Sequence, residues 1–409
     1  MKLFKLSIAA LSLLLYMSSC KQQTLEEQVD KIHSEIVSID THSDTPLNFL
    51  DEDFDIGKWN NFDSTRTRID FPRMKAGKLD AVFMAVFVGQ GERGVDGNQN
   101  AKERAIKIFD ALHEKVTMYP ELAEIGYSSE DVSEIKKKGK STVYIGLENG
   151  YPIGDDLKNI QSFYDLGARY ITLCHTRNND ICDSSTDRKG PEFNGLSEFG
   201  EEVVKEMNRL GMIIDVSHIS DSAYYDVLKT SKTPIIASHS SVRAICNNPR
   251  NFSDDMLHAL KDNGGVIQIC ILSDYVKEPK PYPERDSAFQ ALRVKWNNFK
   301  DLSEEEYRQA SKEWRALSLQ YPKELATVAD AVDHIDYVVQ SIGIDYVGIG
   351  TDFDGGGGLK DCRDASEMKN ITAELLKRGY TQEEIKKIWG ENFLRVFKEV
   401  ENFASSDKI

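Results

Sequence analysis

The chain has 409 residues and a formal net charge of −16 at neutral pH. The excess of acidic side chains argues against nucleic acid or an anionic membrane surface as a partner, because phosphate binding needs concentrated lysine and arginine. Its six cysteines include no Cys-x-x-Cys pair, which excludes a zinc ribbon and a small disulfide scaffold. One or two disulfides remain compatible with the sequence, which does not assign them.

The first residues have the order of a secretory signal: two lysines, an apolar run from Leu6 to Met17, and then Ser18-Ser19-Cys20. The apolar run is too short to span a bilayer comfortably, so a permanent transmembrane anchor is not expected. The end of the run resembles a bacterial lipobox, in which the cysteine becomes the lipidated first residue; an ordinary signal peptide with an incidental cysteine is the alternative. We therefore expect removal of residues 1–19 and export to the bacterial cell envelope, periplasmic or surface-facing, with a lipid on Cys20 as the membrane anchor.

After the signal, residues 20–35 are predicted to be a tether and a first helix, and residues 36–409 a single barrel domain. Eight short apolar or β-branched runs follow, most of them continuous rather than alternating, as is typical of parallel strands covered on both faces. The predicted strands are Ile36–Thr41, Ala81–Val88, Thr142–Leu147, Tyr170–Cys174, Met212–Val216, Pro234–Ala237, Val266–Ile271 and Tyr346–Gly350.

Helical patterns separate these strands. They are Lys102–Tyr119, Asp156–Leu166, Leu196–Leu210 with Asn194 as a favoured cap type, Asp221–Lys229, Ser253–Asn263 and Ala326–Ile342. Eight strands with helices between them predict an α/β fold, the (β/α)8 or TIM barrel. An open doubly wound sheet would usually carry a Gly-rich phosphate turn after its first strand, and none is present.

Two connections exceed the usual length for a barrel. They run from Gly89 to Ser141 and from Ser273 to Lys323, and the second contains a predicted helix at Ser287–Leu317. We therefore expect long insertions after strands 2 and 7, and such ordered excursions are commonly lids or interface elements. The segment Glu367–Phe403 predicts two extra C-terminal helices, with a capping box at Thr381 for the last one.

Polar side chains follow six of the predicted strands, and in a parallel barrel the carboxyl ends of all strands open onto one catalytic face. These are His42 and Asp44 after the first strand, Glu148 after the third, His175 after the fourth, His218 after the fifth, His239 after the sixth and Asp352 after the eighth. The remaining histidines lie in helical patterns, where we expect solvated or capping roles. They are His33, His113, His258 and His334.

Imidazole nitrogens and carboxylate oxygens suit Zn²⁺ and related divalent ions, and a carboxylate between two sites can bridge them. We predict one ion bound by His42, Asp44 and one oxygen of Glu148. A second ion would bind the other oxygen of Glu148, His218 and His239. Two such ions, roughly 3.5–4 Å apart, would share a water, lower its pKa and polarise a carbonyl, as hydrolysis requires. Each residue alone would more often be a core histidine or a surface acid, so the prediction depends on their placement at successive strand ends.

Three further residues could take part in the chemistry. Asp352 could accept a proton from a bridging hydroxide and pass it to a leaving amine, with a turn-capping aspartate as the alternative. His175 could donate a hydrogen bond to the oxyanion of a tetrahedral intermediate. Arg250 could pair with a substrate carboxylate through two points of its guanidinium, although alone it would be taken for a surface charge.

Several segments, in the same order and over nearly the whole mature chain, resemble the membrane (renal) dipeptidase family. They are Asp40-Thr41-His42-Ser43-Asp44, Gly146-Leu147-Glu148-Asn149-Gly150, Thr172-Leu173-Cys174-His175, Asp215-Val216-Ser217-His218, Ala237-Ser238-His239-Ser240-Ser241, Gly350-Thr351-Asp352-Phe353-Asp354-Gly355 and Trp389-Gly390-Glu391-Asn392-Phe393.

This resemblance implies a binuclear zinc dipeptidase on an amidohydrolase-like barrel, which cleaves dipeptides with free ends through a metal-bridging hydroxide. The residues it implies as metal ligands are His42, Asp44, Glu148, His218 and His239. It also implies His175 and Arg250 as substrate contacts and Asp352 as the acid/base group. The segments Val82–Ala85 and Thr176–Asp183 depart from the family pattern, which leaves the side-chain specificity open.

Two alternatives remain at this point. The first is a related barrel hydrolase that acts on β-lactams, lactones or N-acyl amino acids. The second is a non-catalytic, solute-binding lipoprotein, against which Asp352 argues because a binder has no need of a proton carrier. A homodimer is compatible with the sequence, which does not fix the oligomeric state.

Overall fold

The structure is a computed structural model that describes residues 23–51, 54–299, 302 and 304–406. The predicted signal segment and Cys20 lie outside these residues. Among the residues that are described, no helix combines the length and the apolar character needed to cross a bilayer.

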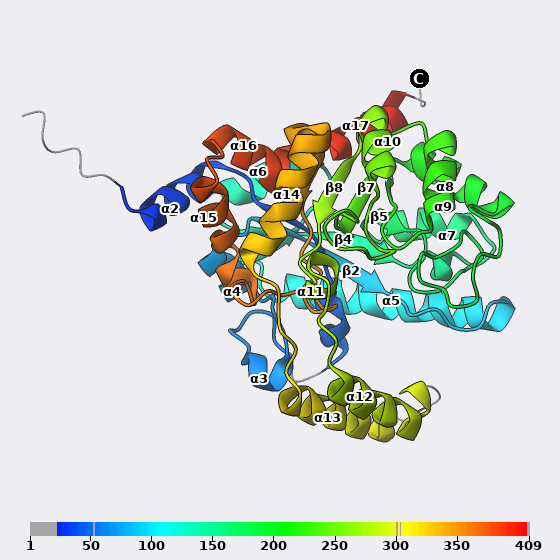
Figure 1. Cartoon of the computed structure of the whole chain (residues 1–409). Helices are drawn as coiled ribbons and strands as arrows, with labels where there is room; N and C mark the ends of the chain where they lie inside the picture. The colour runs from blue at the N-terminus through cyan, green and yellow to red at the C-terminus, as the bar shows by residue number, and fades with distance from the viewer. Residues whose placement is uncertain (1–22, 52–53, 300–301, 303, 407–409) are drawn as a thin grey trace, which may run out of the picture.

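The centre of the fold is a ring of parallel strands, as predicted (Figure 1). The strands are β1 (Ile39–Ser43), β2 (Ala81–Phe87), β3 (Ala123–Ile125), β4 (Ser141–Glu148), β5 (Ala168–Thr172), β6 (Ile213–Asp215), β7 (Ile236–Ser240), β8 (Val266–Ile269) and β9 (Val347–Ile349). Their order is β1-β2-β4-β5-β6-β7-β8-β9, and a parallel bridge between Ser43 and Phe353 brings the two ends of this order together. The (β/α)8 prediction is thus confirmed, with strand boundaries shifted by three residues or fewer.

Most of the helices cover the outside of the ring, one closes an end of it and a few stand off from it (Figure 1). They are α2 (Leu25–Glu35), α3 (Phe62–Thr65), α4 (Phe71–Gly77), α5 (Val95–Thr117), α6 (Asp131–Lys137), α7 (Lys158–Asp165), α8 (Glu198–Leu210), α9 (Asp221–Thr230), α10 (Asp254–Asn263), α11 (Ser273–Val276), α12 (Pro283–Lys295), α13 (Glu304–Gln320), α14 (Val328–Ile342), α15 (Lys369–Lys377), α16 (Gln382–Lys386) and α17 (Asn392–Ser406). The continuous apolar strands are explained by this arrangement, since one strand face meets the helices and the other fills the barrel.

The N-terminal end of the barrel is closed by α17. A cluster of buried side chains combines the first residues of several strands, such as Ile39, Ala81 and Ile213, with Phe393 and Phe397 from α17. Large aromatic side chains from β2, β4 and β5 complete this cluster. The opposite, C-terminal end is therefore the only end of the barrel where the strand termini can form an open site.

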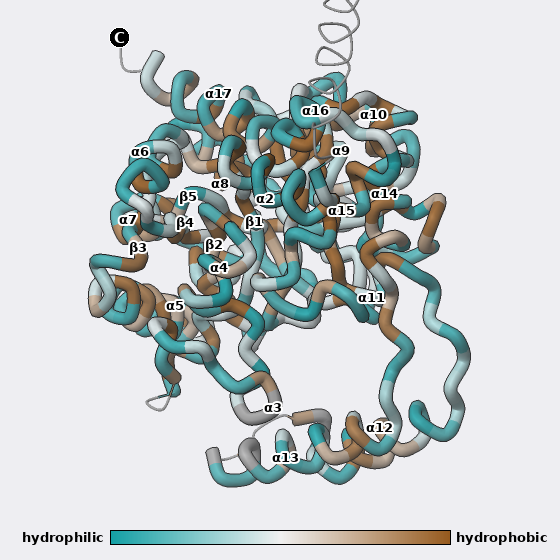
Figure 2. Tube along the Cα trace, turned by 90° about the vertical axis from the view of Figure 1, so that its left-hand side faces the viewer, coloured by the Kyte–Doolittle hydropathy of each residue, from teal (hydrophilic) through white to brown (hydrophobic). Residues whose placement is uncertain are grey.

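The two predicted insertions are present, with details that the sequence pattern did not reveal. The first contains β3, a three-residue strand that pairs with the start of β4. In the second, the helical stretch predicted at Ser287–Leu317 is divided between two helices, α12 and α13. Asn297 and Phe299 between them have left-handed φ angles of 45° and 62°, which a continuous helix does not allow. Figure 2 shows this helix pair standing off from the barrel, with α3 beside it.

The helix ends follow ordinary capping chemistry. The predicted capping box at Thr381 is confirmed at the start of α16. This helix continues through the π-helical residues Lys387–Glu391 into α17 without a break, so that with α15 the segment forms two helices, as predicted. The prediction of Asn194 as a cap is wrong. The cap of α8 is Ser197, whose hydroxyl accepts a hydrogen bond from the Gly200 N–H, while Asn194 takes a left-handed φ of 56° in the preceding loop.

Two of the helical histidines are buried, so the expectation of solvated or capping roles is wrong for them. His33 is 2% exposed and lies between Thr372 and Trp389, with its Nε2 atom 2.8 Å from the Thr372 hydroxyl. His334 is fully buried and accepts a hydrogen bond from the Val242 N–H through Nδ1. Both rings therefore tie distant segments together.

The five cysteines of the described residues are free and buried. The disulfides that the sequence left open are therefore not formed among them.

Candidate metal centre

The predicted site residues converge at the C-terminal end of the barrel, although they are up to 310 positions apart in the chain. Seven of the eight residues fall into three groups. Within each group, the potential ligand atoms all lie within 4.8 Å of one another. The groups are His42 with Glu148 and His239, Glu148 with His175 and His218, and His42 with Asp44 and Asp352. The eighth residue, Arg250, donates a hydrogen bond of 3.1 Å to the backbone carbonyl of His239.

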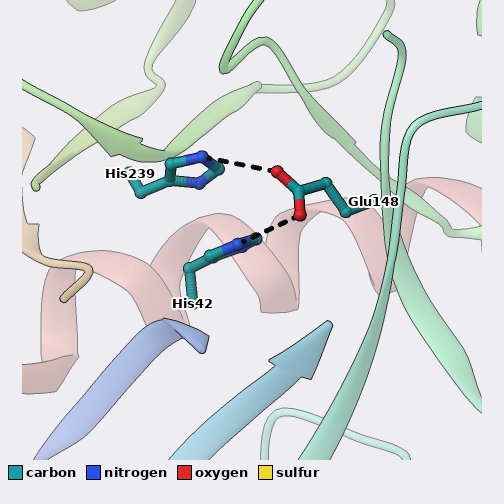
Figure 3. A group of neighbouring side chains, drawn as sticks. All are labelled: His42, Glu148 and His239. Carbon is teal, nitrogen blue, oxygen red and sulfur yellow. Dashed lines mark ion pairs between the residues drawn. The ribbon is translucent and has the colours of Figure 1, made fainter. Parts of the chain in front are cut away.

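Glu148 stands at the centre of this arrangement, at the end of β4. Its two carboxylate oxygens face different histidines, as Figure 3 shows: Oε2 lies 3.5 Å from His42 Nε2, and Oε1 lies 3.6 Å from His239 Nε2. His218 Nε2 is also near Oε1, at 3.2 Å. One carboxylate between two sets of nitrogens is the geometry that a bridging ligand requires.

These distances fit metal coordination better than hydrogen bonding. Two ligand atoms about 2.0–2.2 Å from one tetrahedral ion lie about 3.3–3.5 Å apart. His42 Nε2 is 3.6 Å from Asp44 Oδ2, is fully buried and has no hydrogen-bond partner. A buried nitrogen without a partner is costly unless a ligand satisfies it. The donor set therefore fits divalent cations.

The orientation of His42 is set by a tyrosine. The hydroxyl of Tyr170, in β5, lies 2.8 Å from His42 Nδ1, and the ring crosses the barrel where Gly146 has no side chain. A Cβ atom on Gly146 would stand 2.1 Å from this ring. With Nδ1–H donated to Tyr170, the lone pair of Nε2 points toward Glu148 and Asp44.

His218 and His239 face each other, with their Nε2 atoms 2.9 Å apart. Burial, together with the nearby charge of Arg250 and neighbouring histidines, lowers the pKa of both rings well below the usual value. Neutral rings with converging nitrogens are suitable ligands for a cation, because a protonated nitrogen cannot coordinate.

The carboxylates show the opposite shift. Burial, with the charge of Asp44, raises the pKa of Glu148 to about 7 and that of Asp352 well above its usual value. Several acids are thus held together in the protein interior, where their charges repel one another. A bound cation would relieve this repulsion.

The strand-end turns that carry the site have unusual backbone conformations. His218 and Asp352 adopt left-handed φ angles of 73° and 58°, which are uncommon for residues other than glycine and cluster at functional sites. Gly355 packs directly against the acids: a Cβ atom there would lie 2.0 Å from Asp44 Oδ2 and 2.4 Å from Asp352 Oδ1. Only glycine therefore fits at this position.

His175 and Arg250 lie at the edge of the cluster. The His175 side chain is 24% exposed, the most open of the site, and its ring packs edge-on against Phe87. Burial lowers the pKa of His175 to about 4, so the ring is neutral at pH 7. Arg250 is 4% exposed, and its Nε atom has no hydrogen-bond partner. Among the described residues no carboxylate pairs with this guanidinium.

Sequence reasoning gave no role to three polar residues beside the cluster. They are Tyr170, Asp215 and Asp40, all fully buried. Asp215 accepts hydrogen bonds from Ser217 and Ser238, and Asp40 accepts them from Thr351. An acid within an otherwise apolar strand, as in Ile213-Ile214-Asp215, was the signal that could have identified Asp215. Neither Asp40 nor Tyr170 carried such a signal.

Comparison with known proteins places this site in a family. The family model described as membrane dipeptidase, peptidase family M19, matches residues 26–408. Dipeptidase tcpJ of Claviceps purpurea (strain 20.1) is 34% identical over 345 residues, which cover 83% of this chain and 71% of the relative. Dipeptidase verJ of Clonostachys rogersoniana is 31% identical over 394 residues, which cover 92% of this chain and 88% of the relative.

A solved structure agrees with these matches. The probable dipeptidase PvdM from Pseudomonas aeruginosa superposes with a TM-score of 0.80 at 30% identity, covering 93% of this chain and 99% of that chain. The resemblance noted in the sequence is thus confirmed, while the roles of the individual site residues stay predictions. Fold, site and family model together show that the chain belongs to the membrane dipeptidase family of metallopeptidases, M19.

Proposed function

We propose that the protein is a binuclear zinc dipeptidase. The observation that carries this proposal is Glu148, whose two oxygens face separate groups of ligand atoms. His42 and Asp44, whose Nε2 and Oδ2 atoms lie 3.6 Å apart, would complete one ion position, and His218 and His239, whose Nε2 atoms lie 2.9 Å apart, the other. When bound, the two ions would polarise the scissile carbonyl and activate a water for its hydrolysis.

The remaining residues would handle the proton and the oxyanion. Asp352 lies against His42 and Asp44, and burial beside Asp44 raises its pKa well above the usual value, so it can hold a proton and deliver it to the departing amine. His175 is neutral and partly open to solvent, so its ring N–H can donate to the oxygen that becomes negative in the transition state.

Arg250 would select substrates with a free carboxyl end. Its guanidinium is buried beside His239, lies 5.3 Å from the centre of the Tyr275 ring and lacks a carboxylate partner among the described residues. A buried cation of this kind is costly unless an anion pairs with it. The carboxylate of a dipeptide, bound with its peptide bond at the metal pair, is the anion we propose.

The test is a substrate panel with the purified protein, with and without added Zn²⁺ and with a chelator. We expect zinc-dependent cleavage of dipeptides and, for Arg250→Ala, a larger rise in KM for dipeptides than for their C-terminal amides. An equal loss on both substrates would contradict the role of Arg250. Cleavage only of β-lactams, lactones or N-acyl amino acids would replace the proposed substrate. No turnover at all in the zinc-loaded protein would favour a solute-binding lipoprotein.

We also propose that the protein is exported and anchored by a lipid on Cys20. The support is the sequence pattern alone: an apolar run from Leu6 to Met17 followed by small residues and the cysteine. Cys20→Ser should abolish incorporation of labelled fatty acid and release the protein from the membrane fraction of a bacterial host. A variant that stays lipidated and membrane-bound would disprove this anchor.

A further inference from the structure

Asp215 has no direct contact with the proposed metal positions but connects three strand ends next to them. It ends β6 and is fully buried. Its Oδ1 accepts hydrogen bonds from the N–H groups of Ser217 and Ser238, at 3.0 and 2.8 Å. Its Oδ2 accepts from the hydroxyls of Thr172, at the end of β5, and Ser238, in β7. The carboxylate therefore has four donors and is fully satisfied without a ligand.

Ser238 lies between this carboxylate and His239 and bonds to both. The Ser238 Oγ atom lies 2.6 Å from Asp215 Oδ2 and 2.8 Å from His239 Nδ1. A hydroxyl has one proton, and an ionised carboxylate only accepts, so the Ser238 proton points to Asp215. Ser238 Oγ can then only accept from His239, whose Nδ1 must carry the hydrogen. The lone pair of His239 is thereby placed on Nε2, the atom that faces Glu148.

The same carboxylate also holds the turn that carries His218. Its bond to the Ser217 N–H fixes the residue before His218, and the Ser217 hydroxyl accepts from the His239 N–H at 3.1 Å. His218 itself has a left-handed φ of 73°, a conformation that needs support from its surroundings. Both histidines of one proposed ion position thus depend on Asp215.

The other proposed ion position has a different support. His42 Nδ1 bonds to the Tyr170 hydroxyl, and Asp44 is held through its own N–H, which donates to the Phe353 carbonyl at 2.9 Å. Among the described residues, Asp215 has no hydrogen bond to His42 or Asp44; its partners are Thr172, Ser217 and Ser238. The hydrogen bonds that orient the ligands therefore differ between the two halves, although the His42 and His239 rings lie 3.8 Å apart.

We propose that Asp215 is a positioning residue which, through Ser238, fixes the tautomer of His239 and so sets the affinity of one ion position only. This inference rests on the proposed two-ion centre. Groups that orient a ligating histidine typically change metal affinity by about 10–100-fold when they are removed. The effect should fall on the ion bound by His218 and His239, while the ion bound by His42 and Asp44 keeps its affinity.

The test compares Ser238→Ala with Ser241→Ala in a Zn²⁺ titration of the metal-free protein against a competing chelator. Ser241 is a matched control, since it is fully buried near the same strand end but donates to the Cys270 carbonyl instead of contacting a histidine. We expect Ser238→Ala to weaken one of two binding steps by about 10–100-fold and Ser241→Ala to change neither. Equal titrations for the two variants, or equal weakening of both steps, would overturn the proposal.

A second variant, Asp215→Asn, tests the tautomer directly and keeps the shape of the side chain. An amide N–H facing Ser238 would turn the serine proton toward His239 Nδ1 and favour the hydrogen on Nε2, the wrong tautomer for binding. Nitrogen NMR of the histidine rings in the metal-free protein reports which nitrogen carries the hydrogen. An unchanged His239 tautomer in this variant would also overturn the proposal.

A failure of the proposed two-ion centre can be distinguished from a failure of the role proposed for Asp215. If the wild-type protein binds one Zn²⁺ ion, the proposed two-ion centre is wrong. The connection from Asp215 through Ser238 to His239 is then judged by the His239 tautomer in Asp215→Asn, which does not depend on the number of bound ions.

Discussion

The two ends of the barrel use the same strands for opposite purposes. At the N-terminal end, Phe83, Tyr144, Phe393 and Phe397 stack into a dry cluster in which ring centroids lie 4.8–6.4 Å apart. At the C-terminal end, the same ring of strands holds acids and histidines together, some with unusual backbone angles, and leaves buried nitrogens of His42, His218 and Arg250 without a hydrogen-bond partner. One end is built from contacts that stabilise the fold, and the other from contacts that are unfavourable until a ligand arrives.

Tyr170 belongs to both ends. Its ring stacks on Phe83 at 5.2 Å, and its hydroxyl reaches His42 Nδ1 at 2.8 Å. The apolar end therefore provides a rigid base from which a polar group can position a proposed metal ligand. If this division is correct, substitutions at the two ends should separate activity from stability.

Glu148→Gln should have the largest effect on activity. The amide cannot bridge two cations as a carboxylate does, so we expect a loss of about 10⁴-fold or more in kcat/KM, equivalent to roughly 5.5 kcal/mol. The free energy of unfolding of the metal-free protein should not fall with the activity. Without metal, the variant should be at least as stable as the wild type, because a buried carboxylate near Asp44 has been removed.

Dipeptide hydrolysis and urea unfolding in chelator measure the two quantities. Glu114→Gln, at an exposed position of α5, is the matched control and should change neither. A metal-free Glu148→Gln protein that unfolds more easily than the wild type would contradict the idea that this end of the barrel stores unfavourable interactions.

Phe397→Ala should have the largest effect on stability. The side chain is fully buried against Tyr144 and Phe83, so its removal should lower the free energy of unfolding by about 3–5 kcal/mol. The folded fraction should still bind metal with the wild-type affinity, since this ring contacts neither a proposed ligand nor Tyr170 and is separated from them by Phe83. Phe403→Ala, a half-buried phenylalanine of the same helix, should cost less. Lower zinc affinity in folded Phe397→Ala would show that the two ends are coupled.

Much of this organisation could be predicted from the sequence, because it depends on local patterns. Continuous apolar runs showed the strands, and a His, Asp or Glu at the end of a run was placed on the right face by the barrel topology alone. Even so, the register of β1 against β2 was not predictable. This register shifts between Asp40 and Ser43. The shift is a bulge-like irregularity at the end of the strand, where His42 and Asp44 lie.

What the sequence concealed depends on contacts between distant segments. The role of Asp215 requires Ser238 beside it, which only the pairing of β6 with β7 provides. The burial of His33 requires Thr372 and Trp389, more than 300 residues away. Local periodicity contains no information on such partners, so a histidine in a polar helix was assigned to solvent.

His33 provides the test with the smallest expected effect. It is a buried histidine near the closed end of the barrel, away from the proposed metal positions. Thr372 Oγ1 accepts from the Trp389 indole N–H at 2.7 Å and lies 2.8 Å from His33 Nε2, so the neutral ring completes a small network. Burial lowers the pKa of His33 from 6.5 to about 4. Between these two pH values, His33 is protonated in the unfolded chain but not in the folded protein. The stability that the neutral ring contributes is therefore fully present above pH 6.5 and is lost as the pH falls toward 4.

The expected effect is a change of about 3.5 kcal/mol at most in the stability difference between the wild type and His33→Gln, using about 1.4 kcal/mol per pKa unit. The wild type should be the more stable protein at pH 8, and its advantage should shrink steadily between pH 6.5 and 4, because glutamine does not titrate. Urea unfolding across this range, with and without chelator, measures the difference. The trend should be the same in both conditions, since His33 has no part in metal binding; a difference that is flat with pH, or that depends on zinc, would mean that the closed end of the barrel is not independent of the metal end.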